Sequence, residues 1–170
     1  VDPKRWELKQ AACFTCKSPQ IPELMAEDPD FSKRQFKDVA DKITEPIGCA
    51  NCHDPATNEL KITQPALIEA YAEKGIDVNS LGRQEKRSLV CGQCHVTYYF
   101  DKESNKATFP WGEGFKAEDQ LAYYEKLNFT ESVHPDTGTK LVKPRHAEFE
   151  TFQGSVHQSA GVSCADCHMP

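Results

Sequence analysis

Apolar residues recur at helical spacing in short stretches of this chain, and polar or glycine-containing loops separate the stretches. Residues 31–43 have this spacing and predict a helical segment. Residues 63–75 predict a complete helix, because Thr63 can cap it, Pro65 lies in its first turn and Gly75 follows its end.

Three further helices are predicted later in the chain, over 84–95, over 117–128 and from about Ala147 to Gly161. The second of them carries apolar side chains on one side, at Leu121, Tyr124 and Leu127. Residues 96–100 and 106–109 flank the turn 101–105 and predict a β-hairpin.

The remaining stretches predict loops, among them residues 54–58 and 134–139. The whole pattern predicts a mainly α fold with short helices, long loops and one small β-hairpin. We expect residues 1–170 to form a single segment, because no change in composition marks a second domain.

All eight cysteines fall in four C-x-x-C pairs, and the pairs are embedded in these helices and loops. The pairs are Cys13 and Cys16, Cys49 and Cys52, Cys91 and Cys94, and Cys164 and Cys167. Three of them are followed directly by a histidine, His53, His95 or His168, and the first is followed by Lys17. C-x-x-C-H is the attachment signal of c-type haem, in which both thiols bind the porphyrin and the histidine ligates the iron.

Zinc and dithiol chemistry are the alternatives to haem. Two Cys₄ zinc sites would also use eight cysteines, but zinc ribbons need no histidine at a fixed offset after each pair. Two-residue spacing rarely forms a structural disulfide, so disulfide pairing would make the pairs redox sites. Only six of the 170 residues are histidine, and three of them at the same offset favour haem.

Composition agrees with a cofactor-filled interior. Hydrophobic residues make up 38% of the chain and charged residues 27%. This hydrophobic fraction is low for the core of a protein of this size. No run of 18 apolar residues is present, so we expect no membrane span. The net charge of -6 does not favour nucleic-acid binding. Covalent haem of this kind is assembled outside the cytoplasm, so we expect a periplasmic location.

Three histidines remain once the motif histidines are assigned, and these are His134, His146 and His157. As second axial ligands they would complete three electron-transfer haems, so a tetrahaem electron carrier without catalysis stays a possible interpretation. His146 and His157 are eleven residues apart, about three turns of a helix, so one continuous helix would present both on one face.

Lys17 occupies the place of the iron-ligating histidine in the first motif. A lysine is ordinarily a solvated cation, and only its neutral amine can bind iron, so burial and the metal would have to overcome its high pKa. If Lys17 does ligate the iron, the opposite side of that haem must be open for a substrate to bind.

The motif order CxxCK, CxxCH, CxxCH, CxxCH, with the phrases CKSP, GCANCH, VCGQCHVTYYF, KPRH, HAEFETF and SCADCHMP, resembles pentahaem cytochrome c nitrite reductase, the ammonia-forming type. The resemblance covers essentially the whole chain. It implies a mostly helical multihaem fold and six-electron reduction of nitrite to ammonium. It also implies that Cys13, Cys16 and Lys17 hold the catalytic haem.

The same resemblance assigns further residues. Tyr98 and His146 match the tyrosine and the histidine of the family's distal pocket, where they can deliver or relay protons. His157 matches a ligand of the fifth haem, whose own motif would lie beyond Pro170. Arg5 is too close to Cys13 to match the pocket arginine. We therefore expect an internal fragment that is inactive by itself.

Two departures from the family pattern concern calcium. Most members have a glutamate before the catalytic tyrosine and a glutamine before the histidine, and these residues help to hold a calcium ion. This chain has Thr97 and Arg145 there. Calcium prefers several oxygen ligands, so the resemblance is to a calcium-independent branch in which Arg145 replaces the ion.

The resemblance implies four haem c groups in this segment and a fifth elsewhere in the full-length protein. The implied partners are nitrite and a quinol-linked or cytochrome electron donor, with a homodimer as the full-length assembly. An octahaem nitrite or tetrathionate reductase, which can also use CxxCK, is a further alternative, and counting the motifs in the complete gene would separate the two.

Overall fold

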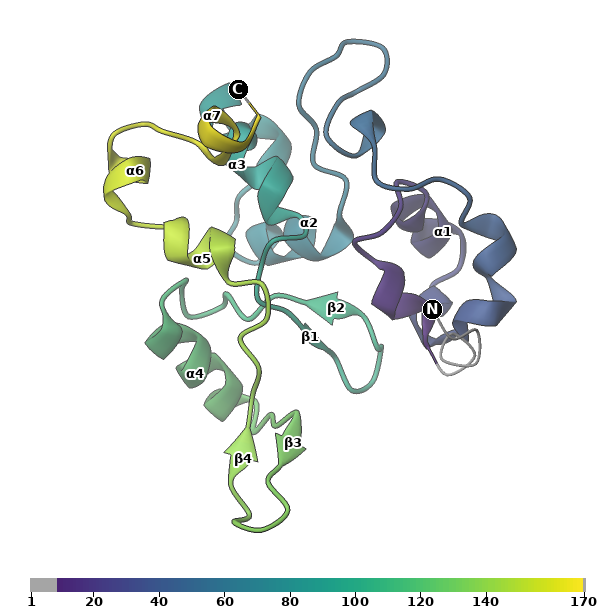
Figure 1. The fold of residues 1–170 in the computed structure, drawn as a ribbon, viewed down its shortest axis with the longest axis vertical. Helices are drawn as coiled ribbons and strands as arrows, with labels where there is room; N and C mark the ends of the chain where they lie inside the picture. The colour runs from purple at the N-terminus through teal and green to yellow at the C-terminus, as the bar shows by residue number, and fades with distance from the viewer. Residues whose placement is uncertain (1–8, 170) are drawn as a thin grey trace.

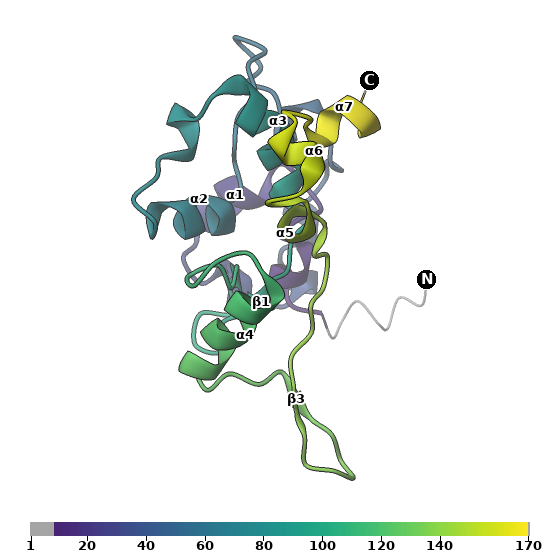
Figure 2. The same cartoon turned by 90° about the vertical axis from the view of Figure 1, so that its left-hand side faces the viewer.

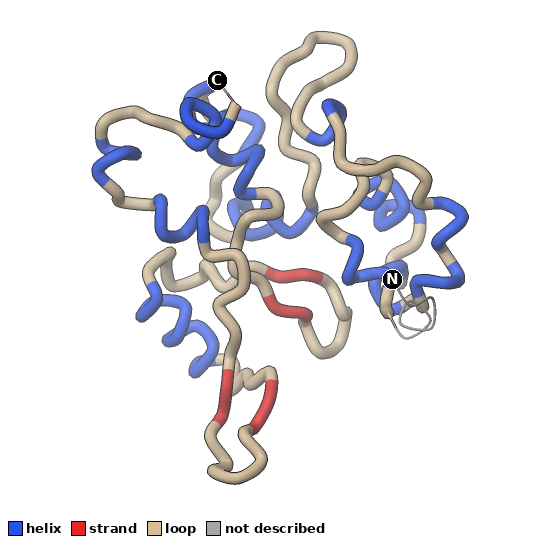
Figure 3. Tube along the Cα trace, viewed as in Figure 1, coloured by secondary structure: helices blue, strands red, loops and turns tan. Residues whose placement is uncertain are grey.

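The computed structural model describes residues 9–169 and consists of short helices joined by long loops (Figure 1 and Figure 3). The predicted mainly α class is confirmed. The α-helices in this range are α1 (Ile21–Glu27), α2 (Pro65–Ala72), α3 (Arg83–Gly92), α4 (Ala117–Lys126), α5 (Glu148–Phe152), α6 (Val156–Ser159) and α7 (Cys164–His168). The 3₁₀ turns are η2 (Ala11–Phe14), η3 (Phe31–Lys33), η4 (Phe36–Asp38), η5 (Ala40–Lys42), η6 (Cys49–Asn51) and η7 (Val78–Ser80). No helix in the described range is long and apolar enough to cross a membrane.

Two antiparallel hairpins accompany the helices. Strands β1 (Tyr99–Phe100) and β2 (Ala107–Thr108) confirm the predicted hairpin. Strands β3 (Ser132–Val133) and β4 (Lys140–Leu141) form a second hairpin around the loop predicted over 134–139. Figure 1 and Figure 2 both show β3 and β4 extending away from the body of the molecule.

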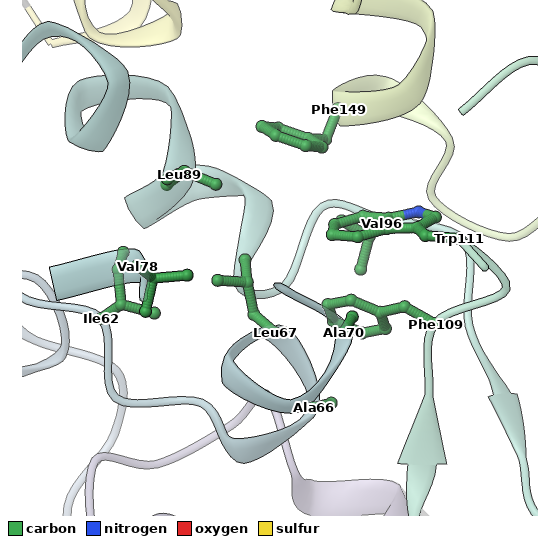
Figure 4. Close-up of a cluster of buried hydrophobic side chains, with 10 residues drawn as sticks. All are labelled: Ile62, Ala66, Leu67, Ala70, Val78, Leu89, Val96, Phe109, Trp111 and Phe149. Atoms are coloured by element: carbon green, nitrogen blue, oxygen red, sulfur yellow. The ribbon is translucent and has the colours of Figure 1, made fainter. Parts of the chain in front are cut away.

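The larger core cluster lies between α2, α3, α5 and the segment that follows β2. Its members are Ile62, Ala66, Leu67, Ala70, Val78, Leu89, Val96, Phe109, Trp111 and Phe149. Figure 4 shows Phe149 above the fully buried Trp111, with Phe109 below it. The centroids of the Trp111 and Phe149 rings are 5.4 Å apart, at 29°. This stack joins α5 to the hairpin segment.

A smaller cluster supports the first C-x-x-C motif and contains Ala11, Ile21, Phe31 and Val39. The prediction of one helical segment over 31–43 is wrong, because the region forms the three turns η3, η4 and η5. Arg34 and Val39, at the ends of η3 and η4, have non-helical backbone angles, which interrupt the helix. The apolar side chains still reach the core, because 3₁₀ turns also bring residues three apart to one side.

The predicted continuous helix from Ala147 to Gly161 is also wrong. It is divided into α5 and α6, and Gly154 lies between them with φ +73, which is outside the helical region. His146 precedes α5 and His157 lies in α6, so the two histidines do not share one helix.

Two details of the other helices differ from prediction. In α4, Tyr124 is buried as expected, but Leu121 and Leu127 are each 51% exposed, and Gln120 is buried instead. Helix α2 begins after Gln64 and has no side-chain cap, because the Thr63 hydroxyl donates to Gln93 Oε1 instead of capping the helix.

Candidate haem-binding active site

Each C-x-x-C motif lies on a helical turn, and the first motif differs from the second and third in its backbone pairing. The amide of His53 donates to the carbonyl of Cys49 at 2.8 Å, and His95 pairs with Cys91 in the same way at 2.9 Å. The amide of Lys17 donates to Phe14 O instead, at 2.8 Å. The first motif is therefore the more tightly wound, and it presents lysine where the others present histidine.

The third motif lies beside both the first and the fourth. The Cys16 thiol donates to Gln93 O at 3.8 Å. Interaction with the Cys94 thiol lowers the pKa of Cys16, and the same interaction raises the pKa of Cys94. Burial and the neighbouring Cys164 thiol raise the pKa of Cys91 to about 11. Two porphyrins attached to the first and third motifs would therefore be neighbours.

A cavity of about 150 Å³ lies over the first motif, and segments distant in the sequence meet at it. Its lining includes Cys13, Cys16, Lys17, Tyr98 and His146. The structure thus brings together all three residues predicted to be catalytic, although 129 positions separate Lys17 from His146 along the chain. Cys13 and Lys17 also line an adjoining cavity of about 460 Å³.

His95, predicted as an iron ligand of the third motif, also lines the 150 Å³ cavity. The centroids of its ring and the His146 ring are 6.3 Å apart. Burial raises the pKa of the Tyr98 phenol, and the Arg145 guanidinium partly opposes that effect. The phenol therefore keeps its proton at neutral pH and can donate it.

Hydrogen bonds join the Tyr98 segment to the segment that follows His146. The amide of Phe149 donates to His95 O at 3.0 Å. Glu150 Oε1 accepts from the amide of Thr97 at 2.9 Å and from Trp111 Nε1 at 2.8 Å. These bonds hold together the two segments from which Tyr98 and His146 line one cavity.

The sequence analysis missed Glu150, although the phrase HAEFETF contains it. Its side chain is buried, and burial raises its pKa. Glu150 Oε2 and the Thr97 hydroxyl have no hydrogen-bond partner among the described residues. A buried carboxyl group with few donors around it favours the neutral form. Only its burial, which the sequence does not reveal, distinguishes it from a surface glutamate.

Arg145 lies against the backbone and the ring of Tyr98. Its Nη1 donates to Tyr98 O at 2.7 Å, and its guanidinium carbon is 4.7 Å from the centroid of the Tyr98 ring. Its Nη2 pairs with Glu131, which also lies 3.5 Å from Lys143 Nζ. Arg145 therefore bridges the carbonyl of the predicted catalytic tyrosine and a carboxylate, and does not point freely into solvent.

The other predicted residues lie apart from this cavity. His157 is exposed in α6, and His134 lies in the loop between β3 and β4, where its Nδ1 accepts from the amide of Asp136. His53 and His168 belong to the second and fourth motifs, and Arg5 lies outside the described residues. The structure does not bring His157 together with His146.

The eight thiols are not arranged as zinc sites. Within residues 9–169, no group of three or more His, Cys, Asp or Glu side chains is placed to share a metal ion. The Cys₄ clusters that the zinc alternative requires are thus missing from the described part of the chain.

Comparison with known proteins gives the family. Residues 4–170 match the family model of cytochrome c552. This chain belongs to the cytochrome c552 family. Cytochrome c-552 from Porphyromonas gingivalis is 43% identical over 166 residues, which cover 96% of this chain and 33% of that protein. This chain thus spans about a third of the length of the curated relatives it matches.

Two relatives of this cytochrome c552 chain are described as nitrite reductases. Cytochrome c nitrite reductase subunit NrfA from Nitratidesulfovibrio vulgaris is 41% identical over 94% of this chain and 34% of that protein. The solved structure of cytochrome c nitrite reductase from Desulfovibrio desulfuricans superposes with a TM-score of 0.86 at 41% identity, over 94% of this chain and 37% of that one. Two calcium sites are described in its catalytic subunit.

The space around the second motif fits the haem c expected of a cytochrome c552. A cavity of about 1020 Å³ is lined by Cys49, Cys52 and His53, and also by Cys91 from the third motif. Cofactor pockets commonly measure about 300–1,000 Å³. The lining also includes the cations Arg83, Lys86 and Arg87, which suit the carboxylates of a porphyrin.

Proposed function

We propose that this chain forms the nitrite-reducing site of an ammonia-forming cytochrome c nitrite reductase. The observation that carries the proposal is the cavity over the first motif, which Lys17 shares with Tyr98 and His146. A relative named for this activity, 41% identical over 94% of the chain, supports it. The reaction is the six-electron reduction of nitrite to ammonium.

When bound, the haem of the first motif supplies the iron that holds nitrite and passes electrons to it. Cys13 and Cys16 would attach that group, and the neutral amine of Lys17 would ligate its iron. The Tyr98 phenol and the His146 imidazole lie over the same motif and deliver protons as the N–O bonds break. A phenol whose pKa burial has raised remains a donor at neutral pH.

Arg145 replaces calcium beside this site in our proposal. Its planar guanidinium donates in two directions, to Tyr98 O and to Glu131, as a cation that gathers oxygen atoms would bind them. The charge is fixed because arginine does not lose its proton in proteins. Calcium is therefore not required for activity.

The remaining assignments rest on the resemblance. His53, His95 and His168 ligate the irons of three electron-transfer haems, so the segment carries four haem c groups. His157 ligates the iron of a fifth haem, whose motif lies elsewhere in the protein. The periplasm is the location, a quinol-linked or cytochrome donor supplies electrons, and the full-length protein forms a homodimer.

The test is ammonium formation by the haem-loaded protein expressed from the complete gene. We expect Tyr98→Phe and His146→Asn each to lower kcat by about 10²-fold or more, since a positioned general acid contributes about 10²–10⁴. Tyr99→Phe is the matched control, because the Tyr99 hydroxyl hydrogen-bonds Tyr123 and does not line the cavity.

Two results would contradict the proposal. Full activity in both variants would exclude Tyr98 and His146 from the reaction. A wild-type spectrum with every haem low-spin and unchanged by nitrite would favour the electron carrier, since an open haem must bind the substrate.

A further inference from the structure

One buried side chain connects three of the four haem motifs. Gln93, the residue before Cys94, is 3% exposed. Its Nε2 donates to Asn51 O at 3.1 Å, and Asn51 is the residue before Cys52. The third motif is thus hydrogen-bonded directly to the interior of the second.

The same side chain reaches the first motif through one intermediate. Gln93 Oε1 accepts from the amide of Thr63 at 2.6 Å and from the amide of Gln64 at 3.0 Å. Gln64, which is 2% exposed, then donates from its Nε2 to Thr15 O at 2.7 Å. Thr15 is the residue before Cys16, so the chain of bonds ends inside the first motif.

The connected residues occupy the same position in their motifs, immediately before the second cysteine. Thr15, Asn51 and Gln93 are all at least nine-tenths buried. C-x-x-C-H leaves this position free, because haem attachment requires only the two thiols and the ligand. At Thr15 and Asn51 the backbone carbonyl makes the contact, and at Gln93 the side chain makes it.

We infer that Gln93 is a positioning residue that fixes the first three haem motifs relative to one another, with Gln64 as its link to the first motif. The inference rests on the proposed function, because the spacing matters if electrons pass between these haems to the open one. Electron tunnelling slows exponentially with distance, so a small displacement of one motif slows the transfer. Both polar atoms of the Gln93 side chain make hydrogen bonds, whereas Gln64 Oε1 has no partner among the described residues. A buried side chain that is bonded through both of its polar atoms holds such distances more rigidly than apolar packing alone.

The test compares Gln93→Met and Gln64→Met in the haem-loaded protein expressed from the complete gene. Methionine has nearly the volume of glutamine but makes none of these bonds. Gln64→Met removes only the hydrogen bond to Thr15 O. Gln93→Met removes the hydrogen bonds to the second motif and to Gln64. The control is Gln35→Met, the same change at an exposed glutamine.

The measurement is the rate at which electrons from a photoreductant reach the open haem, followed by absorbance with no nitrite present. Haem content and thermal unfolding are recorded for each variant. We expect Gln93→Met to slow arrival severalfold, since tunnelling slows exponentially as the distance between two haems increases. Gln64→Met should slow it less, and Gln35→Met should leave it unchanged.

A purely structural role would lower the unfolding temperature and leave the rate in the folded protein unchanged, which would overturn the inference. If Gln93→Met loses haem, Gln64→Met decides the question, because it leaves the link to Asn51 intact. The rate is independent of the substrate, so a wild-type protein that fails to reduce nitrite contradicts the proposed function alone.

Discussion

Individual side chains at this site are interpretable only with their contacts. Arg145 departs from the family pattern in sequence, and an arginine is ordinarily an exposed cation. The structure places it against Tyr98 O, the Tyr98 ring and Glu131, with 22% of its side chain exposed. A half-buried arginine between a carbonyl and a carboxylate is held in place and also holds Tyr98 in place.

The hypothesis that Arg145 replaces a calcium ion can be tested at the level of this one residue. We expect a calcium chelator, and calcium added afterwards, to leave ammonium formation by the wild-type protein unchanged. Arg145→Ala should lower kcat up to ~100-fold, since the Tyr98 segment then loses its anchor. Arg34→Ala is the control, because Arg34 also pairs with a carboxylate but lies on the surface, against Asp28.

Two results would contradict the hypothesis that Arg145 replaces calcium. Loss of activity on chelation and its recovery with calcium would refute the replacement, as would full activity in Arg145→Ala. Arg145→Lys should recover little, because lysine keeps the charge but lacks the planar fork that binds two acceptors at once.

At the scale of elements, the contact between α3 and α5 connects the third motif to the rest of the site. Gly92 is the last residue of α3, and the Phe149 ring of α5 lies directly over it. A Cβ at Gly92 would be 2.7 Å from the ring. The glycine inside the CGQC phrase therefore permits α5, and with it His146, to approach the motif.

This close approach predicts the effect of one methyl group. Gly92→Ala should destabilise the haem-loaded protein by about 1–3 kcal/mol, the usual cost of overpacking, because neither the ring nor the α3 backbone can move freely. Thermal or denaturant unfolding measures the change. Gly48→Ala, directly before the second haem motif, should be nearly neutral, since the nearest atom to its Cβ would be 3.8 Å away. Equal stability of the two variants would show that α5 adjusts at no cost.

At the scale of the whole chain, the described residues 9–169 form little interior of their own. Its cores are one cluster between α2, α3 and α5 and a smaller one under the first motif. The cavity of about 1020 Å³ at the second motif is lined by that motif and by residues of α3. With 38% hydrophobic residues, the chain relies on the porphyrins for the apolar contacts that its side chains do not make.

Haem removal should therefore abolish cooperative unfolding. We expect the chain produced without haem attachment to have no sharp thermal transition and to expose apolar surface that binds a hydrophobic dye. The haem-loaded protein is the reference. A sharp transition in the haem-free chain at the same temperature would show that the side-chain cores suffice.

Local features of this protein were predictable from the sequence. The four motifs, α2, α3, α4 and the β1–β2 hairpin all appear where the pattern placed them, because each depends on residues close together in the chain. Two helix predictions were wrong because helical spacing of apolar residues was taken as evidence for one continuous helix. Gly154 interrupts the helix predicted over 147–161, and the backbone at Arg34 and Val39 divides 31–43 into turns.

The sequence by itself therefore determined which thiols, lysine and histidines are available and which of them share a motif, since covalent order sets those relations. Only the tertiary structure decided which of them meet. The cavity shared by Lys17, Tyr98 and His146 and the links made by Gln93 join segments about 30 to 130 residues apart. Such contacts depend on packing and buried hydrogen bonds across the whole molecule, which no local pattern encodes.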